Sequence, residues 1–509
     1  MVSLPGPSSL RARYRLATAD LTLGTLLERT AAVHDHRVLV DEAGGRCVSH
    51  IEAAALVDRW AGVVAARTEP GDRVVVALPN GIDAWLACLA VSRAGALPVP
   101  LNDRATKAET DHVVADAGAA WVLRSVDELA GGEPLGGARP ADPDAVAALL
   151  YTSGTTGRPK GVELTHRALL GSLGTAALWP SSLRDDEAVV ALPIAHVMGF
   201  VVLLGLAVSG IRVHLLPHFR PDEVLDAIEQ RRASAFVGVP AMFRMLLAAG
   251  ADQRDLRSVR IWGSGADALP ADLARRFKRF GAAAQLPGIG PIGEAAVVEG
   301  YGMVEVGGGV AVKVSPPLLP VGLGDGVGFR LPGWKWRVVD PDTDQVVRPG
   351  GIGELQLKGP GVLRGYWGGG EPPVTADGWL RTGDLVRRGL VGTVAFTGRA
   401  KDVVKHGGYS VYAVEVEQCV EEHPDVIEAA VVGVPDALLG EIPAAAVRVR
   451  AGAVVDPAAL DRWVDERLAD YKRPRRWLLV DELPRTGTGK IRRAEVLDRM
   501  AGTDDPTEA

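Results

Sequence analysis

Short apolar runs alternate with longer amphipathic segments over the first half of this chain, and this pattern restricts the fold more than any other feature. Such alternation is typical of parallel sheets whose faces are covered by helices. We therefore expect an α/β fold whose first part holds two parallel-sheet subdomains. The predicted strands are residues 73–78, 121–124, 188–192, 211–215, 235–238 and 259–262, and the predicted helices are residues 82–94, 165–178, 221–232 and 241–249.

The rest of the chain has a different texture. Between Gly307 and Phe396, glycine, proline and β-type residues dominate, which predicts a small β-rich subdomain. From about Arg399 onward, two helical segments (413–422 and 457–469) and two apolar strands form a region of a size usual for a separate domain. We predict an N-terminal domain of residues 1–398 and a small mobile α+β domain of residues 399–509.

The composition of the 509-residue chain is that of an ordinary water-soluble protein, with 47% hydrophobic and 23% charged residues. The net charge of −7 gives no reason to expect a nucleic-acid partner. The longest apolar run, residues 197–208, is too short to span a membrane, and the N-terminus has no apolar core of signal-peptide length. Cys47, Cys88 and Cys419 form no CxxC pair, so we expect neither a disulfide framework nor a zinc site, and we expect a cytoplasmic protein.

A glycine- and hydroxyl-rich segment, YTSGTTGRPKG at residues 151–161, follows the apolar run of residues 145–150. Glycines allow backbone N–H groups to turn toward an anion, hydroxyls donate further hydrogen bonds, and Arg158 and Lys160 can neutralise charge. A plain linker would need neither the apolar run nor the two cations. The segment is not a Walker loop, because Gly161 rather than Ser or Thr follows the lysine. We predict a phosphate-binding loop.

This loop resembles that of the acyl-adenylate-forming enzymes, which include acyl- and aryl-CoA synthetases, nonribosomal-peptide adenylation domains and firefly luciferases. Four further motifs appear in the family's order: EGYGMVE at 299–305, TGD at 382–384, GRAKD at 398–402 and PRTGTGK at 484–490. Together the motifs cover most of the chain. The resemblance implies an enzyme that uses ATP and Mg²⁺ to activate a carboxylic acid and then transfers it to the thiol of CoA.

The resemblance also implies a set of nucleotide- and cofactor-binding residues. In this sequence the set is Thr152, Ser153, Gly154, Thr155, Thr156, Gly157, Lys160, Gly300, Tyr301, Gly302, Asp384, Arg399, Lys401 and Gly408. Tyr301 would flank the adenine and Gly302 the acyl pocket. Asp384 would accept both ribose hydroxyls, because a carboxylate only accepts hydrogen bonds and can be bidentate. Arg399 would add a donor to the ribose or phosphate.

Two of these residues belong to the second half-reaction. Lys401 would mark the hinge about which the small C-terminal domain rotates between the half-reactions. Gly408 would let the pantetheine arm of CoA pass, since a glycine permits close approach to the backbone.

Catalytic roles are implied for three further side chains. Glu305 would hold Mg²⁺ against the ATP phosphates, which suits a hard cation and a hard oxygen ligand. Lys490 would bridge the acid and the α-phosphate during adenylation and offset charge that builds up in the transition state. His196 would lie at the edge of the acyl pocket. A histidine in an apolar run is also often a satisfied core residue, so both interpretations of His196 stay open.

The chain departs from the family pattern at several positions. Val304 replaces the usual threonine, whose hydroxyl contacts a phosphate, and valine cannot donate that bond, which is worth roughly 1.5–3 kcal/mol. Ala195 stands where an aromatic residue usually precedes the histidine, and Ala413 replaces a usual proline.

One motif in the sequence is rejected. GIGPIG at residues 288–293 fits GxGxxG, but the neighbouring prolines disrupt a strand-to-helix turn, and no second strand ending in an acidic residue follows at the required distance. We interpret residues 285–295 as a loop that either shapes the acyl pocket or decorates the surface.

The sequence predicts an ATP-dependent carboxylic acid:CoA ligase for an apolar acid, either fatty or aryl. Nothing acidic occurs from Pro193 to Gly210, where amino-acid-activating relatives carry an aspartate, and Val197, Met198 and Val201 suggest an apolar pocket. The open alternatives are an enzyme that loads a carrier protein or another acceptor, one that activates an unusual acid such as nitrite, and a non-catalytic nucleotide-binding protein.

Overall fold

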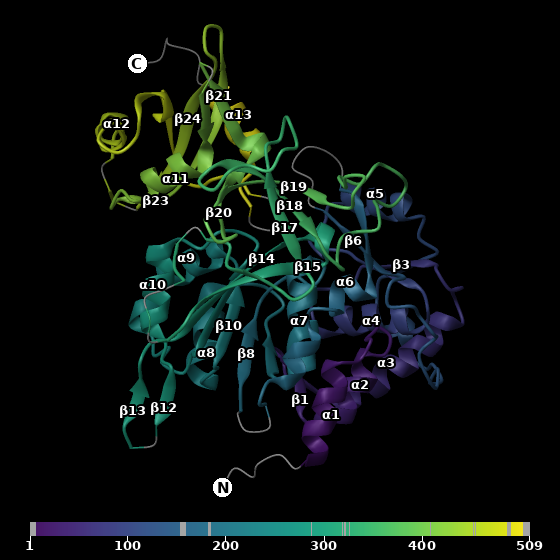
Figure 1. The fold of residues 1–509 in the computed structure, drawn as a ribbon. Coiled ribbons are helices and arrows are strands. Elements are labelled where there is room, and N and C mark those ends of the chain that lie inside the picture. The colour runs from purple at the N-terminus through teal and green to yellow at the C-terminus, as the bar shows by residue number, and fades with distance from the viewer. Residues whose placement is uncertain are drawn as a thin grey trace. The chain divides into compact units, whose positions relative to one another are not determined.

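The computed structural model describes residues 7–152, 159–181, 185–286, 288–317, 319, 322–324, 326–407, 409–450, 452–453, 455–485 and 490–501, which group into two compact units (Figure 1). Unit 1 consists of Met1–Thr152, Arg158–Lys335 and Lys358–Leu380, as far as they are described. Unit 2 consists of Trp336–Leu357 and the described chain from Arg381 onward. The predicted domain boundary between residues 398 and 399 stays a prediction.

A nine-stranded mixed sheet forms the centre of unit 1. Its strands run in the order β16, β15, β14, β11, β10, β8, β9, β1, β2. Neighbours from β14 to β1 are parallel, whereas β15, β16 and β2 pair antiparallel at the two margins. The bounds are β1 Val38–Glu42, β2 Arg46–Ser49, β8 Glu187–Val190, β9 Arg212–Leu215, β10 Ala235–Gly238, β11 Ile261–Gly265, β14 Ala296–Met303, β15 Gly308–Ser315 and β16 Phe329–Arg330. The parallel centre confirms the α/β expectation.

An aromatic core lies between this sheet and the helices α8 (Pro221–Arg231), α9 (Pro240–Ala248) and α10 (Ala271–Phe280). Phe236, Phe243, Trp262 and Phe277 are fully buried there and meet edge to face, with ring centroids 4.9–6.2 Å apart. Such pairs contribute about 0.5–1.5 kcal/mol each beyond simple burial. The core therefore gives firm support to the loops at the carboxyl ends of these strands.

A second, three-stranded parallel sheet of unit 1 has the order β4, β3, β5. Its strands are β3 (Arg73–Val76), β4 (Leu97–Pro100) and β5 (Trp121–Leu123), and the helices around them are α3 (His50–Ala65), α4 (Ile82–Arg93) and α5 (Lys107–Ala117). Capping boxes start α3 at Ser49 and α5 at Thr106, and α5 ends at Gly118 in the left-handed region. Two parallel sheets are thus present, as the alternation predicted.

The remaining helices of unit 1 are α1 (Pro7–Ala17), α2 (Leu26–His34), α6 (His166–Leu170) and α7 (Val197–Ser209). The longest apolar run of the sequence became α7. No helix among the described residues combines the length and the apolarity needed to cross a bilayer. All three cysteines are free thiols.

Two predicted elements of unit 1 were wrong. The helix expected over residues 165–178 is interrupted: α6 ends at Leu170, and a 3₁₀ helix covers Gly174–Leu178. Gly171 and Gly174 weaken the helical run, and a Cβ at Gly174 would overlap the backbone of Ala17, so packing of α1 decides this break.

The segment 285–295 is not a loop. It forms an antiparallel hairpin of β12 (Ala284–Leu286) and β13 (Gly290–Ile292). Gly288 and Gly290 have φ of 75° and 94°, which only glycine adopts freely at a tight turn. Pro291 is tolerated because this hairpin is a separate two-stranded sheet. A hairpin here also confirms that GIGPIG is not a dinucleotide-binding turn.

Unit 2 contains two antiparallel-rich sheets. The first has the order β17 (Lys335–Val339), β18 (Ile352–Lys358), β19 (Leu380–Arg388), β20 (Val394–Arg399). The second has the order β22 (Tyr409–Tyr412), β21 (Val403–His406), β24 (Gly440–Val449), β23 (Val426–Asp436), and β25 (Arg476–Val480) pairs with β24. The helices are α11 (Ala413–Glu421), α12 (Pro457–Asp465) and α13 (Arg493–Ala501).

Alternation along β23 divides the core of unit 2 into two layers. Ala429 and Val431 face one cluster, which includes residues of α11 and α12. Ala430 and Val432 face the other cluster, which includes Val496 of α13. Successive side chains of a strand point to opposite faces, so one apolar strand supports helices on both sides. This is the small α+β arrangement that the sequence predicted.

Candidate active site

The predicted phosphate loop connects two paired strands of unit 1. The predictions for Ser153, Gly154, Thr155, Thr156 and Gly157 lie outside the described residues. The loop is flanked by β6 (Val146–Tyr151) and β7 (Gly161–Thr165), which pair antiparallel. The backbone N–H of Thr152 donates to the carbonyl of Lys160 at 3.0 Å, and the N–H of Lys160 lies 3.5 Å from the Thr152 hydroxyl. The two ends of the loop are thus held side by side.

A segment far along the chain joins the outgoing end of this loop. We call residues 363–367 the strap. Tyr366 forms an antiparallel bridge with Val162 of β7, and the N–H of Trp367 donates to the carbonyl of Gly161 at 2.8 Å. The N–H of Leu363 donates to the carbonyl of Glu305 at 2.8 Å. The strap therefore connects β7 to Glu305 through the backbone.

Tyr366 of the strap contacts two predicted site residues. Its hydroxyl lies 3.4 Å from Oε1 of Glu305, and Nζ of Lys160 lies 5.3 Å from the centre of its ring. Burial, followed by the Glu305 charge, raises the pKa of Tyr366 to about 12, so the phenol stays protonated and donates to the carboxylate. One aromatic side chain thus brings the predicted phosphate cation and the predicted metal ligand together.

The surroundings of Glu305 fit a Mg²⁺ ion that is shared with phosphates. Among the described residues, this carboxylate accepts a hydrogen bond from Tyr366 and pairs with no cation. No group of three or more His, Cys, Asp or Glu side chains in the described chain could hold a metal by itself. Mg²⁺ usually keeps several waters and binds through one or two carboxylates plus substrate phosphates, so a single carboxylate suffices.

The EGYGMVE motif continues from a strand into a short helix. Gly300, Tyr301 and Gly302 lie in β14, while Val304 and Glu305 lie in the 3₁₀ helix Val304–Val306. A Cβ at Gly302 would overlap the carbonyl oxygen of Gly308 on β15, so the pairing of these strands alone requires glycine. The sequence linked Gly302 to the acyl pocket, and the structure gives it a further, purely structural reason.

His196 lies directly before α7, partly exposed, and its carbonyl accepts from the N–H of Phe200 at 3.0 Å. The segment before it is held by Asn80, which sequence reasoning missed. The Asn80 side chain accepts from the N–H of Ile194 at 2.8 Å and donates to the carbonyl of Pro217 at 2.6 Å. Both interpretations of His196, pocket edge and satisfied side chain, stay open.

Asp384 of unit 2 is held in a bend that its own motif builds. The Thr382 hydroxyl donates to the carbonyl of Leu355 at 2.6 Å and accepts from the N–H of Asp384 at 3.0 Å. Gly383 has φ of 69°, and its N–H donates to Oε1 of Glu354 at 3.0 Å. The side chain of Asp384 is 1% exposed, and its Oδ1 pairs with Nε of Arg399 at 2.7 Å.

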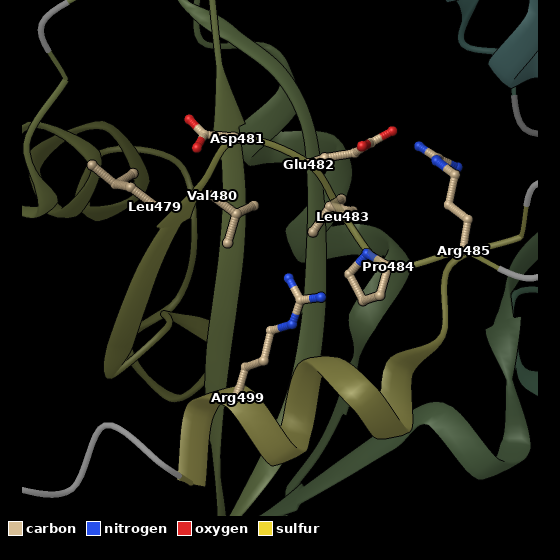
Figure 2. Close-up of a pocket in the computed structure, with 8 residues that line it drawn as sticks. All are labelled: Leu479, Val480, Asp481, Glu482, Leu483, Pro484, Arg485 and Arg499. Carbon is tan, nitrogen blue, oxygen red and sulfur yellow. The ribbon is translucent and has the colours of Figure 1, made fainter.

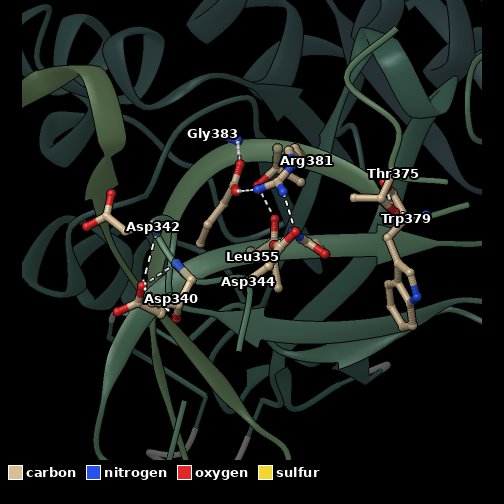
Figure 3. A network of polar contacts seen from close by, with 12 residues as sticks. Asp340, Asp342, Asp344, Leu355, Thr375, Trp379, Arg381 and Gly383 are labelled. Atoms are coloured by element: carbon tan, nitrogen blue, oxygen red, sulfur yellow. Dashed lines mark hydrogen bonds and ion pairs between the residues drawn. The ribbon is translucent and has the colours of Figure 1, made fainter. Parts of the chain in front are cut away.

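A polar network on β18 and β19 supports this bend (Figure 3). Arg381 donates to Glu354 at 3.1 Å and to Asp344 at 2.5 Å. Glu354 therefore accepts from both Arg381 and the N–H of Gly383. The structure thus brings two predicted residues, Asp384 and Arg399, into direct contact.

The loop before Lys490 is closed at its base, although residues 486–489 are not described. Arg485 and Ile491 form an antiparallel bridge, and the N–H of Arg492 donates to the carbonyl of Pro484 at 2.8 Å. Arg485 also pairs with Glu428. Lys401 is exposed in the 3₁₀ helix Ala400–Asp402, and the prediction for Gly408 lies outside the described residues.

A hollow of about 570 Å³ lies beside this loop base in unit 2 (Figure 2). Its lining is Leu479, Val480, Asp481, Glu482, Leu483, Pro484, Arg485 and Arg499. The side chain of Arg499 projects into it from α13 (Figure 2) and pairs with Glu495 at 2.9 Å. None of the predicted site residues lines this hollow.

Comparison with known proteins identifies the family. The model of the AMP-binding enzyme family matches residues 27–367, and that of the AMP-binding enzyme C-terminal domain matches residues 415–490. This chain belongs to the AMP-binding enzyme family. The resemblance inferred from the motifs is thereby confirmed.

This AMP-binding enzyme is 35% identical to a feruloyl-CoA synthase of an Amycolatopsis species, over 94% of this chain and 99% of the relative. The solved structure of ATP-bound MatB from Rhodopseudomonas palustris is 32% identical, with a TM-score of 0.82, over 94% of this chain and 98% of that one. The o-succinylbenzoate CoA synthetase of Bacillus subtilis, solved with its acyl-adenylate intermediate, is 27% identical, with a TM-score of 0.80, over 93% and 97%.

Three side chains of this AMP-binding enzyme that hold the site were missed by sequence reasoning: Asn80, Asp116 and Tyr366. Asp116 accepts from the hydroxyl of Tyr151 at 2.7 Å. Each acts on a partner at least 35 positions away, so no local pattern could reveal it. The signal available was weak: a tyrosine and a tryptophan at 366–367 in a glycine-rich stretch.

Proposed function

We propose that this AMP-binding enzyme is an ATP-dependent carboxylic acid:CoA ligase. The observation that carries the proposal is the cluster of Lys160, Tyr366 and Glu305, which sets a cation and a free carboxylate beside the phosphate loop. That pair suits a triphosphate with its metal. Similarity over nearly the whole chain to a feruloyl-CoA synthase supports CoA as the acceptor.

The reaction has two steps. In the first, a carboxylate oxygen attacks the α-phosphorus of ATP, an acyl-adenylate forms and pyrophosphate leaves. In the second, the CoA thiol attacks the acyl carbon, its proton is lost, a thioester forms and AMP leaves. Among the structural neighbours are an ATP complex and an acyl-adenylate complex, which agree with this order of reaction steps.

The roles of individual residues are part of the proposal. Lys160 and the phosphate loop hold the phosphates, and Glu305 would bind Mg²⁺, which neutralises charge on them. Asp384 accepts the ribose hydroxyls and Arg399 assists it. Lys490 stabilises the transition state of adenylation. Lys401 and Gly408 serve the second step.

We propose an apolar acid, aryl or fatty, as the substrate. Every residue of α7 from Val197 to Ser209 is uncharged. Near its start, Met198 approaches Gly265, and Val201 approaches Gly308 at the margin of β15. Such a surface has no cation for a second carboxylate and no anion for an ammonium group. A carrier protein as acceptor and a cytoplasmic location remain predictions.

The test is pyrophosphate release with Mg-ATP and a panel of aryl, fatty and inorganic acids, with and without CoA, followed by mass spectrometry of the products. We expect CoA-dependent turnover that yields a thioester with an aryl or fatty acid. Pyrophosphate without thioester would move the acceptor to a carrier protein. No pyrophosphate release with any acid would contradict the ligase and favour a non-catalytic nucleotide-binding protein. The first variant to test would then be Val304→Thr.

Replacing Lys490 separates the two half-reactions. We expect Lys490→Ala to lower the rate of adenylation by about 100-fold or more, as for loss of a transition-state donor. Thioester formation from supplied acyl-adenylate should stay within about twofold, since that step does not use the same charge. Lys335→Ala, at an exposed lysine of β17, is the matched control. Equal loss of both half-reactions would contradict this role.

A further inference from the structure

Helix α5 presents three stripes of side chains with different exposure. Asp111 and Ala115 are exposed, Val113 and Ala117 are buried, and the stripe between them is half-buried. Residues four apart lie on one face of a helix, so each stripe is one row. The buried row packs in a small core with Leu149 of β6. The middle row consists of His112 and Asp116, and both residues are partly exposed.

Asp116 holds the incoming end of the phosphate loop. It accepts from the hydroxyl of Tyr151, the last residue of β6, at 2.7 Å. The ring of Tyr151 packs so closely on Gly161 that a Cβ there would approach it to 3.0 Å. Burial and the neighbouring carboxylate raise the pKa of Tyr151, so its hydroxyl stays a donor.

His112 holds the outgoing end of the same loop. Its Nε2 lies 2.8 Å from the carbonyl oxygen of Pro159. A carbonyl only accepts, so Nε2 must carry the hydrogen. Pro159 itself has no N–H and directly precedes Lys160, so this bond fixes the backbone at the start of Lys160.

We propose that α5 is a clamp on the phosphate loop, and that His112 and Asp116 are positioning residues for nucleotide binding. One row of one helix reaches residues 35 and 47 positions away and ties both ends of the loop to the small sheet. Fixing the flanking residues Tyr151 and Pro159 before ATP arrives lowers the entropic cost of binding it. The inference rests on the proposed function, since it assigns the loop to ATP.

The experiment compares variants of the full chain by calorimetric titration with ATP and by steady-state kinetics. Asp116→Ala should raise the ATP Kd and the ATP KM by about tenfold, as for one charge-assisted hydrogen bond, and leave the KM of the acid within about twofold. Tyr151→Phe should give the same change, and the double variant should be little worse than either single one. Asp116→Asn keeps an acceptor for the tyrosine and should recover most of the affinity.

His112 is tested in the same way. His112→Leu should also raise the ATP Kd several-fold, while His112→Gln, which keeps a side-chain N–H donor, should restore part of it. Asp111→Ala is the matched control, because it removes a carboxylate from the same helix that only pairs with Lys107 on the surface. That variant should bind ATP like the wild type.

The outcomes separate this inference from the proposed function. Equal ATP affinity in Asp116→Ala, Tyr151→Phe and Asp111→Ala would overturn the clamp. The clamp would also be overturned if the affinities for ATP and for the acid both weakened in proportion to a lowered melting temperature. That result is a general effect of destabilisation. Wild-type protein that binds ATP but releases no pyrophosphate would instead contradict the ligase, while the Kd differences would still decide the clamp.

Discussion

The two units treat their charged site residues in opposite ways. In unit 1, Lys160 and Glu305 pair with no opposite charge among the described residues, and a neutral phenol lies between them. In unit 2, by contrast, the site residue Asp384 forms an ion pair with the site residue Arg399 at 2.7 Å. Charges left without a protein partner are available for a phosphate and its metal, whereas a paired charge meets its ligand in an orientation that its partner already fixes.

The largest expected difference between the units is their stability at low pH. Unit 1 buries four histidines, His34, His50, His166 and His214, and burial lowers the pKa of each, most strongly for the first three. Burial lowers the pKa of His34 to about 4, of His50 to about 3 and of His166 to about 4. In the unfolded chain a histidine has a pKa of about 6.5. Below that pH the unfolded chain binds protons that the folded chain does not bind, so this contribution to stability is complete above about pH 6.5 and is lost as the pH falls. The loss is at most about 4 kcal/mol per pH unit for three groups.

Hydrogen exchange followed by mass spectrometry at stepped pH measures this difference. Peptides of unit 1 should lose protection between pH 6 and 4, before those of unit 2, because the buried histidines of unit 1 take up protons on unfolding in that range. His166→Asn is the matched variant, because it keeps an acceptor for the N–H of Leu23 without titrating. It should lower the pH at which unit 1 opens. Loss of protection in both units at the same pH would contradict the expected difference in their acid stability.

The next largest effect is expected at Asp384. Asp384→Asn should weaken ATP or AMP binding by about 100-fold, which corresponds to about 3 kcal/mol for two hydrogen bonds to a charged group. The control is Asp465→Asn, which breaks the ion pair of Arg473 at an exposed position elsewhere in the same unit. Exposed pairs contribute about 0–1 kcal/mol, so its binding should change little. Calorimetric titration decides, and equal losses would assign Asp384 a structural role.

The smallest effect sharpens the description of unit 1. Tyr366→Phe keeps the ring beneath Lys160 and removes only the hydroxyl that contacts Glu305. Loss of a hydrogen bond to a metal-binding carboxylate typically costs 10- to 100-fold in metal affinity, so we expect about a tenfold higher Mg²⁺ concentration for half-maximal ATP binding. ATP binding without Mg²⁺ should stay unchanged. Tyr409→Phe, at an exposed tyrosine of unit 2, is the control, and an unaltered Mg²⁺ dependence would contradict the role of the hydroxyl.

Local patterns gave most of the elements. The strand predicted at 235–238 is β10, and the helices predicted at 82–94 and 221–232 differ from α4 and α8 by one residue. Periodicity and helix-end signals act within a few residues, so a sequence carries them directly. The two failures had different causes. The break after α6 is non-local, because it depends on the backbone of Ala17. The β12–β13 hairpin is local, but it has too few apolar residues to signal strands.

The sequence by itself determined the family, the order of the motifs and the residue types that the chemistry needs. Only the tertiary structure decided which other side chains hold the motif residues in place. The strand order β14, β11, β10, β8, β9, β1 does not follow the chain, and the strap and α5 reach the phosphate loop from opposite directions in sequence. A hydrogen bond depends on distance and angle in space, so such partners become visible only once the sheets have fixed which segments meet.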